Sequence, residues 1–435
     1  MQNKTIGAIL SFLLMGLGQL YNRQWLKGFL FMTIGITSIY FFSFFLFDYL
    51  SGLVTLGTTP SGMVKVGRLT TLVEGDHSIF LMIKGLMALI VMLFVIGLYV
   101  LNIRDAYFVG LSRDQGNHPH SFVRSLSELN QKHFAYLVLA LPFIVVTYLT
   151  ILPLIFSVML AFTNYADPIL PPANLVDWIG FDNFSRILSL KTWSRTFGGV
   201  LQWTLIWAVI ATITTYIGGI LVAVLIHQPK LRFKKFWRTV LIIPFAIPNM
   251  VALLVMRNMF NDKFGPINGY LRFLGLDGLP WLTDPFWAKV TVIIANMWIG
   301  VPITMILVFG ILTTIPRDLY EAAEVDGASS VQKFRLITMP MVLFATAPIL
   351  IMQFAGNINN FNVIYLLTNG EPLNTDYQYA GHTDLLVTWL YKLALNQAQY
   401  SFASVIGIFI FLLVASFSLW SYRRTRSYKE EDMIQ

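Results

Sequence analysis

Amide side chains recur at helical spacing within an apolar segment near residue 355. The run IMQFAGNINNFN begins at residue 351 and places Gln353, Asn357 and Asn360 at positions i, i+4 and i+7. Residues at that spacing share one face of an α-helix. An uncharged amide both donates and accepts hydrogen bonds, so this face is suited to bind a neutral solute that carries hydroxyl groups. The alternative is that the amides join neighbouring helices as packing contacts.

A second apolar segment carries a similar arrangement. Asn296 is followed by Gly300 and Ile303 at comparable spacing, and Ile299 lies alongside them. A polar group at membrane depth is costly unless it has a partner. Asn296 is therefore a candidate for the same solute site or for a helix-packing contact.

A third apolar segment pairs an aromatic ring with an amide. Phe245 and Asn249 are spaced i, i+4, and each directly follows a proline, Pro244 or Pro248, which loosens a helix at that point. We expect the ring of Phe245 to be able to stack against an apolar face of the solute.

A short polar stretch between two long apolar segments contains a different pattern. Glu321, Ala322 and Ala323 are followed by Gly327. Residues 319–326 are predicted to form a short helix, in which the two alanines provide a small, close-packing face. Gly327 allows the backbone to turn because glycine tolerates positive φ. The alternative is an ordinary polar connector.

The composition sets the class of protein. Of the 435 residues, 56% are hydrophobic and only 12% are charged, about half the charged share of a soluble domain. This composition predicts an all-α, polytopic helical membrane protein. The net charge of +8 is attributed to cytoplasmic loops that face anionic lipid, rather than to nucleic acid.

The sequence offers no catalytic or metal-binding pattern. It contains no cysteine, its six histidines lack ligand spacing, and it has no glycine-rich phosphate-binding loop. We therefore expect no catalytic residue, no metal and no cofactor in this chain.

Eight apolar segments are long enough to span a membrane, which takes about 20 residues. They are residues 28–48, 80–103, 136–162, 197–227, 237–257, 289–314, 338–357 and 403–422. Residues 6–21 are apolar but shorter, and they could form a ninth span, a re-entrant segment or an interfacial segment.

Basic residues predict the orientation of these spans. The five segments 1–27, 104–135, 228–238, 315–337 and 423–435 hold 19 of the 30 Lys and Arg residues. Because Lys and Arg are enriched in cytoplasmic loops, both termini are predicted to be cytoplasmic. We expect an N-terminal membrane segment over residues 1–135 and a core of six spans over residues 136–435, with its cytoplasmic loop at about 315–340.

The polar stretch resembles the signature loop of ABC importer permeases. It fits Glu-Ala-Ala-x3-Gly-x9-Ile-x-Leu-Pro and ends at Pro340, although Met339 replaces the usual Leu. Further segments are similar to sugar-importer permeases, above all to the larger permease subunits of maltose/maltodextrin importers. These segments are GFDNFSRIL, IIPFAIPNM, MFNDKFGPIN, WLTDP, NMWIGVP, NNFNVIYLLTNGEP and AGHTDLLVTWLY, between residues 180 and 391.

The resemblance implies a multi-pass cell-membrane permease of an ATP-driven importer for a neutral oligosaccharide, with maltose or maltodextrin as the first choice. The implied partners are a second homologous permease, two copies of an ABC ATPase, an extracellular or periplasmic sugar-binding protein and membrane lipid. The implied substrate-binding residues are Phe245, Asn249, Asn296, Ile299, Gly300, Ile303, Gln353, Asn357 and Asn360. The implied ATPase-coupling residues are Glu321, Ala322, Ala323, Gly327 and Pro340.

Two other classes of function were weighed. A membrane-embedded transferase would need paired carboxylates or histidines at the membrane surface, whereas Asp105, Asp114 and Asp384 are isolated in the sequence. A receptor or scaffold would have no need of the signature loop. Another neutral sugar remains the alternative substrate within the transport hypothesis.

Overall fold

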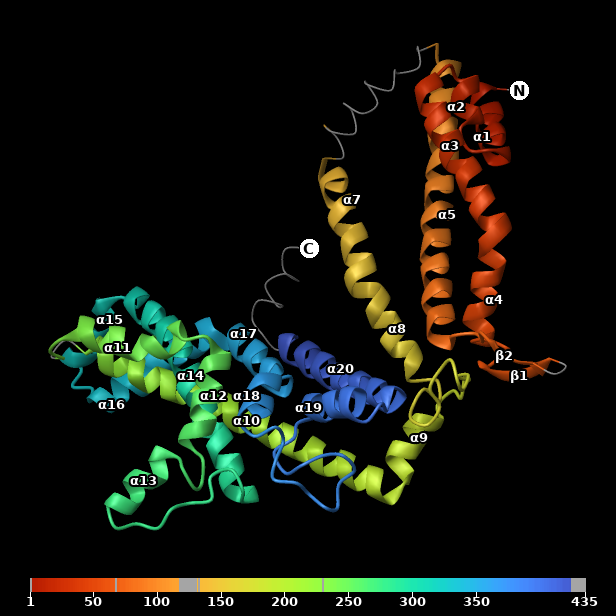
Figure 1. The fold of residues 1–435 in the computed structure, drawn as a ribbon. Helices are drawn as coiled ribbons and strands as arrows, with labels where there is room; N and C mark the ends of the chain where they lie inside the picture. Colours follow the sequence, from red (N-terminus) through yellow and green to blue (C-terminus); the bar gives the residue numbers. More distant parts are fainter. Residues whose placement is uncertain (1, 67–68, 117–130, 132–133, 229–230, 424–435) are drawn as a thin grey trace. The chain divides into compact units, whose positions relative to one another are not determined.

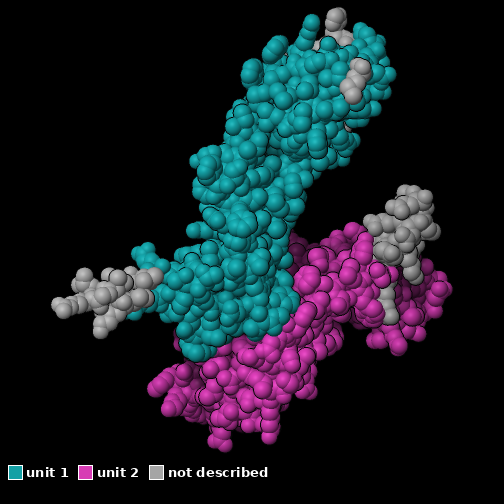
Figure 2. All heavy atoms as spheres, turned by 90° about the vertical axis from the view of Figure 1, so that its right-hand side faces the viewer, with its two compact units in different colours: residues 1–180 teal, residues 181–435 magenta. Residues whose placement is uncertain are grey.

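The computed structural model describes the chain except residues 1, 67–68, 117–130, 132–133, 229–230 and 424–435. The chain divides into two compact units, residues 1–180 and 181–435, which Figure 2 shows in different colours. The division predicted at residue 135 rests on the cytoplasmic connector, most of which falls outside the described residues. That division therefore stays a prediction.

The first unit consists of helices and one described β-hairpin (Figure 1). Its elements are α1 (Asn3–Leu13), α2 (Leu17–Tyr21), α3 (Trp25–Phe41), the π-helical segment η1 (Phe42–Leu46), α4 (Phe47–Thr55), β1 (Gly62–Val66), β2 (Leu69–Val73), α5 (Ser78–Asp114), α7 (Phe134–Val146), η2 (Thr147–Ile151) and α8 (Leu152–Leu160). The two strands pair antiparallel, with Val64 opposite Thr71. This hairpin is a small addition to the predicted all-α fold.

Residues 6–21 form a hairpin of two short helices and not a ninth span. α1 has 11 residues and α2 has five, both well below the length of a span. The chain reverses at Gly16, whose φ of 91° is in the left-handed region that glycine adopts easily. A side chain at Gly16 would also collide with the backbone of Gly28.

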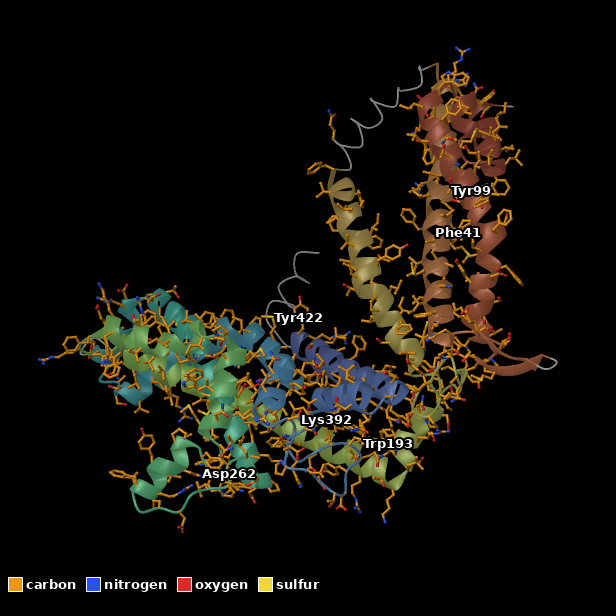
Figure 3. All side chains as sticks on the ribbon, viewed as in Figure 1. Phe41, Tyr99, Trp193, Asp262, Lys392 and Tyr422 are labelled. Carbon is orange, nitrogen blue, oxygen red and sulfur yellow. The ribbon has the colours of Figure 1, made fainter. Side chains whose placement is uncertain are left out.

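Contacts with α5 show that this hairpin folds back along one end of that helix. The N–H groups of Asn3 and Lys4 donate to the Asp114 carboxylate at 2.9 and 3.0 Å, at one end of α5. Near the tip, the Tyr99 hydroxyl (labelled in Figure 3) donates to the carbonyl of Phe12. After α2 the chain is back near the first end of α5, where the Asn22 amide donates to the carbonyl of Ala106 at 3.0 Å. The hairpin thus enters and leaves at the same end of α5.

The second unit is built from helices and the loops that join them (Figure 1). Its elements are α9 (Asp182–Ser189), α10 (Lys191–His227), α11 (Lys234–Ala246), α12 (Asn249–Met259), α13 (Pro266–Phe273), α14 (Pro285–Thr314), α15 (Arg317–Val325), α16 (Ser330–Lys333), η3 (Phe334–Thr338), α17 (Met339–Ile358), α18 (Phe361–Leu367), α19 (Leu386–Tyr391), η4 (Lys392–Asn396) and α20 (Tyr400–Tyr422).

The predicted spans are confirmed. Among the described residues, seven helices are long and apolar enough to cross a membrane, and an eighth span is counted if α11 and α12 form one broken span. The two halves of that span meet at 94°. The break follows from Pro248, because a residue before proline, here Ile247, is pushed out of the helical region.

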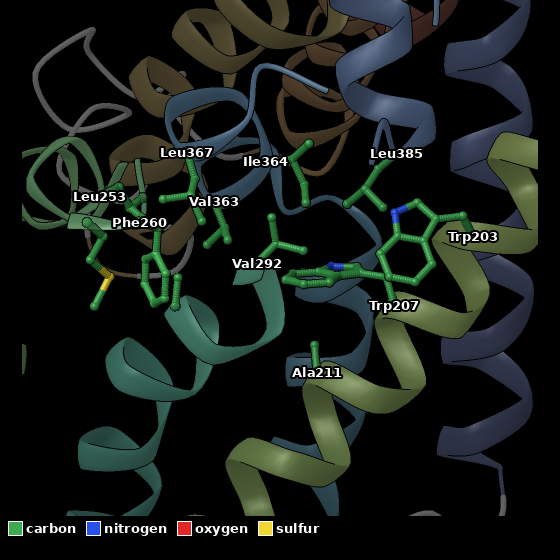
Figure 4. Close-up of a cluster of buried hydrophobic side chains, with 12 residues drawn as sticks. Trp203, Trp207, Ala211, Leu253, Phe260, Val292, Val363, Ile364, Leu367 and Leu385 are labelled. Atoms are coloured by element: carbon green, nitrogen blue, oxygen red, sulfur yellow. The ribbon is translucent and has the colours of Figure 1, made fainter. Parts of the chain in front are cut away.

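Two buried apolar clusters hold the second unit together. The first includes Trp203 and Trp207 of α10, Val292 of α14 and Ile364 of α18 (Figure 4). The second joins α10, α14 and α17 through residues such as Val308 and extends to the short helices after α14. The candidate residues on α14 and α17 and the polar stretch after α14 are therefore held by the same group of helices.

Candidate functional site

The candidate amides of α17 lie against α10. Gln353 donates to the Thr215 hydroxyl at 2.7 Å, and Asn357 donates to the Thr212 hydroxyl at 2.9 Å. A third contact between α10 and α17 joins two hydroxyl groups, those of Tyr216 and Thr346, whose oxygens are 2.6 Å apart. We call these three pairs the polar ladder. They line up because residues 212, 215 and 216 share a face of α10 at i, i+3 and i+4.

Asn360 joins the same cluster from outside the helix. α17 ends at Ile358, so the predicted helical face holds for Gln353 and Asn357 only. Asn360 instead caps α18, where its oxygen accepts the N–H of Val363 at 3.3 Å. Its amide donates to Asn296 at 3.1 Å and reaches Asn357 at 3.5 Å. Three of the predicted amides are thus connected although the helix between them is interrupted.

The amides are engaged with protein and mostly shielded. Asn296 and Asn357 are each 7% exposed, whereas Gln353 is half-buried. The arrangement fits the packing alternative as well as a solute site, since each contact links two helices. An amide still has further hydrogen-bonding capacity beyond the single bond it donates.

Sequence reasoning missed the hydroxyl partners of these amides. Thr212, Thr215, Tyr216 and Thr346 lie in apolar segments, and none was singled out. The signal was present in the run ATITTY, which starts at residue 211 and places hydroxyl groups at helical spacing inside a span. An amide face on one predicted span and a hydroxyl face on another indicate a pair of contacting helices.

Gly300 provides close approach between helices. A Cβ atom at this position would lie 2.7 Å from Cγ2 of Thr215, so α14 and α10 could not keep their spacing. Ile299 is partly buried against the first apolar cluster. Both residues therefore support the position of the amides and have packing roles in this structure.

An open cavity of about 310 Å³ borders the polar ladder between α10, α14 and α17. Three of the predicted residues, Gly300, Ile303 and Gln353, are among its walls, together with Tyr216 and Thr346. Ile303 is 49% exposed there. All residues that line the cavity are uncharged, which suits a neutral ligand.

Phe245 and Asn249 do not share a helical face, although a spacing of i, i+4 would place them on one face of an unbroken helix. α11 ends at Ala246 and α12 begins at Asn249, so the 94° break separates the two residues. Both are exposed, Phe245 by 57%, and neither lines the cavity beside the ladder. The cause is Pro248, which ends the helix instead of merely loosening it.

The polar stretch forms a closed helical hairpin after α14. The predicted helix over 319–326 is observed as α15, Arg317–Val325. Gly327 makes the turn with a φ of 74°, as predicted. The N–H groups of Ala328 and Gly327 donate back to Ala323 and Glu324 at 2.8 and 3.1 Å, a pattern that satisfies the last carbonyl groups of a helix.

Further contacts fix this hairpin to the spans. Ser329 and Gln332 form a capping box at the start of α16. Lys333 pairs with Glu324 at 3.2 Å, and the hydroxyl groups of Tyr320 and Thr338 are 2.9 Å apart. Tyr320 also packs against the second apolar cluster. We call residues 317–338 the coupling hairpin.

The outer side of the coupling hairpin is uncovered. Glu321 and Ala322 are exposed, whereas Ala323 is partly buried. Val325 is 89% exposed, and Pro340, in the first turn of α17, is also exposed. Among the described residues, Glu321 has no ion-pair partner, so its carboxylate is available to a cation from outside this chain.

Known proteins resemble this chain over its whole length. Residues 215–427 match the family described as the binding-protein-dependent transport system inner membrane component. The galactooligosaccharides transport system permease protein GanP of Bacillus subtilis is 40% identical over 99% of this chain and 100% of its own length. The maltodextrin transport system permease protein MalC of Streptococcus pneumoniae is 37% identical, over 99% of this chain and 98% of its own.

A solved structure shares the fold. A subunit of a bacterial alginate ABC transporter, in complex with an alginate pentasaccharide-bound periplasmic protein, aligns with a TM-score of 0.56 at 23% identity. The alignment covers 69% of this chain and 96% of that subunit.

Proposed function

Because this chain belongs to the family of binding-protein-dependent transport system inner membrane components, we propose that it is the permease of an ABC importer for a neutral oligosaccharide. Maltose or a maltodextrin is the proposed substrate. The observation that carries this proposal is the full-length similarity to a maltodextrin permease, at 37% identity. The chain is a multi-pass cell-membrane protein, and its family comprises permease subunits and not enzymes. The membrane-embedded transferase is therefore set aside.

The energy for import would come from a separate subunit. The sequence has no phosphate-binding loop, and the coupling hairpin offers an exposed acidic residue and small alanines to a partner. We propose two copies of an ABC ATPase, one of which receives Glu321. A second homologous permease and an external sugar-binding protein complete the proposed assembly. The related alginate transporter was solved with a periplasmic protein, which supports a binding protein here.

The sugar would pass beside the polar ladder. In this proposal Gln353, Asn357, Asn360 and Asn296 exchange part of their contacts for sugar hydroxyls as the helices move. The uncharged cavity wall supports a neutral substrate, because a buried charge without a partner is strongly unfavourable. Phe245 and Asn249 would contact the sugar from α11 and α12, the two halves of the broken span, because both side chains are exposed in this structure.

A galactooligosaccharide is the second candidate substrate. It is favoured by the 40% identity to a galactooligosaccharide permease, which is similar over the entire chain. Both candidates are uncharged and rich in hydroxyl groups, so they make the same demands on amide side chains. The two proposals differ only in the shape of the sugar.

Uptake measurements distinguish the substrates. Cells with and without this chain are given labelled maltotriose in the presence of unlabelled maltodextrin, galactooligosaccharide or glucose 6-phosphate. We expect chain-dependent uptake that maltodextrin suppresses and glucose 6-phosphate does not. A labelled galactooligosaccharide is given in a parallel measurement, and chain-dependent uptake of that label alone would identify the second candidate. Failure of the chain to increase the uptake of either label would refute the transport proposal.

A further inference from the structure

A separate groove lies at one end of α10, α11 and α14, away from the cavity beside the polar ladder. It has a volume of about 290 Å³. The residues that line it are Ile226, Arg238, Ile242, Met305, Ile306 and Phe309. Five of these six are apolar, so the groove offers almost no hydrogen bonds to a sugar. Its shape and lining are instead suited to hydrocarbon.

A single cationic side chain stands among those apolar walls. The Arg238 guanidinium lies 5.3 Å from the centroid of the Phe309 ring, a cation–π contact that holds it at the edge of the groove. Among the residues that the structure describes, no carboxylate pairs with Arg238. A guanidinium presents several N–H donors that match the oxygens of a phosphate.

Other positive charges gather at the same end of the groove. The His227 ring also contacts Phe309, with ring centroids 5.8 Å apart. The charges of Lys234 and Arg317 act on that His227 ring. Neither Lys234 nor Arg317 forms an ion pair within the described part of the chain. Positive charges gathered in this way favour the binding of an anion.

The neighbouring side chains place this end of the groove at the membrane surface. Phe233, Phe236 and Trp237 are 79%, 59% and 46% exposed around the start of α11, where they alternate with basic residues. Exposed aromatic and basic residues are typical of the boundary between lipid headgroups and hydrocarbon. From Arg238 the groove leads to Ile242, one helical turn deeper into an apolar span.

We propose that this groove binds one anionic phospholipid, with its phosphate on Arg238 and one acyl chain along the apolar walls. Lys234 and Arg317 supply additional positive charge around the headgroup. The site goes beyond the transported substrate, since a lipid here would stay bound while the sugar passes. Because α14 leads directly into the coupling hairpin, the lipid would sit between the broken span and the element that contacts the ATPase.

The test measures lipid retention by the assembled transporter that contains this full chain. Native mass spectrometry follows complexes exchanged into detergent with added phosphatidylglycerol or phosphatidylcholine. We expect one retained phosphatidylglycerol, bound about tenfold more tightly than phosphatidylcholine. Arg238→Gln should weaken phosphatidylglycerol about tenfold, as expected for the loss of a charge-assisted hydrogen bond. Ile306→Trp should fill the groove and lower the retention of both lipids.

Lys235→Gln is the matched control. It removes one positive charge from the same turn of α11, but Lys235 does not line the groove. We expect Lys235→Gln to change retention less than about twofold, within ordinary surface effects. Equal losses in the Arg238 and Lys235 variants would mean diffuse attraction and overturn the site. Absence of retained lipid in the unaltered complex would also overturn it. Neither result depends on sugar uptake, so the transport proposal is judged separately.

Discussion

The two interpretations of the polar ladder, helix packing and sugar binding, give different predictions for a substitution of Asn357. Asn357→Ala removes the bond to Thr212 and leaves that hydroxyl without its donor. We expect the free energy of unfolding to fall by about 1–3 kcal/mol. If the amide also binds sugar, maltodextrin uptake should fall roughly 2- to 10-fold, with a higher KM.

Thr212→Val is the control for this prediction. It removes the hydroxyl and keeps both the shape and the Asn357 amide. Thermal unfolding should show a comparable loss of stability, whereas the KM for maltodextrin should be unchanged. An unchanged KM in both variants would assign the ladder to helix packing alone.

Glu321 is predicted to couple the permease to its ATPase. The residue is exposed and lacks an ion-pair partner among the described residues, so folding does not depend on it. Glu321→Ala should leave the chain in the membrane and lower sugar-driven ATP hydrolysis about tenfold or more, as for a lost charge pair at an interface. Glu324→Ala is the control, because Glu324 is 74% exposed in its side chain and pairs within the hairpin. Normal uptake by the Glu321 variant would contradict the prediction.

At the scale of single residues, the sequence indicates which amides are candidates for the site but not which side chains they bond. Gln353, Asn357 and Asn360 were predicted to share one helical face, which holds for Gln353 and Asn357, whereas Asn360 reaches Asn357 from the cap of α18. The hydroxyl partners of these amides were not predicted, because a threonine in a span commonly bonds its own helix. Thr215 does so, donating to Ala211 at 2.6 Å, and it accepts the Gln353 amide as well. The second role depends on which helix is adjacent, which a single sequence does not specify.

At the scale of elements, the loop before α19 depends on a buried ion pair. Asp384 is fully buried and lies 2.6 Å from the Lys392 ammonium, labelled in Figure 3. Its carboxylate also accepts Gly381 at 2.7 Å and Thr388 at 2.8 Å. Burial raises the pKa of Asp384, and these partners oppose that rise. The carboxylate thus connects the loop to α19 and η4.

Removal of this carboxylate should destabilise the loop. Asp384→Ala leaves a largely buried ammonium unpaired, which costs about 3–5 kcal/mol in such sites. A thermal melt of the assembled transporter measures the loss. Asp376→Ala breaks an exposed pair with Arg195 and should cost less than about 1 kcal/mol. Equal melting temperatures for the two variants would disprove the structural role of Asp384.

Elements were predictable where apolar length alone determines them. All eight predicted spans have a counterpart, and the short helix before Gly327 begins two residues earlier than predicted. What hydropathy does not settle are the interruptions. The full break between α11 and α12 comes from Pro248, whose effect was underestimated as a loosened helix. Residues 6–21 were left open, and the turn at Gly16 makes them a hairpin that packs on α5.

The orientation of the whole molecule can be tested with single cysteines, because the chain contains none. Val325, 89% exposed in the coupling hairpin, is predicted to be cytoplasmic, whereas Phe273, 86% exposed in α13, is predicted to be external. In intact cells an impermeant thiol reagent should label Phe273→Cys and not Val325→Cys. Labelling in the reverse pattern would invert the topology. The C-terminal tail, also predicted to be cytoplasmic, lies outside the described residues.

The hairpin of α1 and α2 makes bonds that depend on a helix synthesised later. Gln19 bonds to Asn102 and to Asp105, and the latter is 86 residues further along the chain. A ribosome that adds about 5–20 residues per second needs roughly 4–17 seconds to reach it. During that interval α1 and α2 exist without the helix that supplies their polar partners. The first part of the chain to be synthesised can therefore reach its final structure only after α5 has been made.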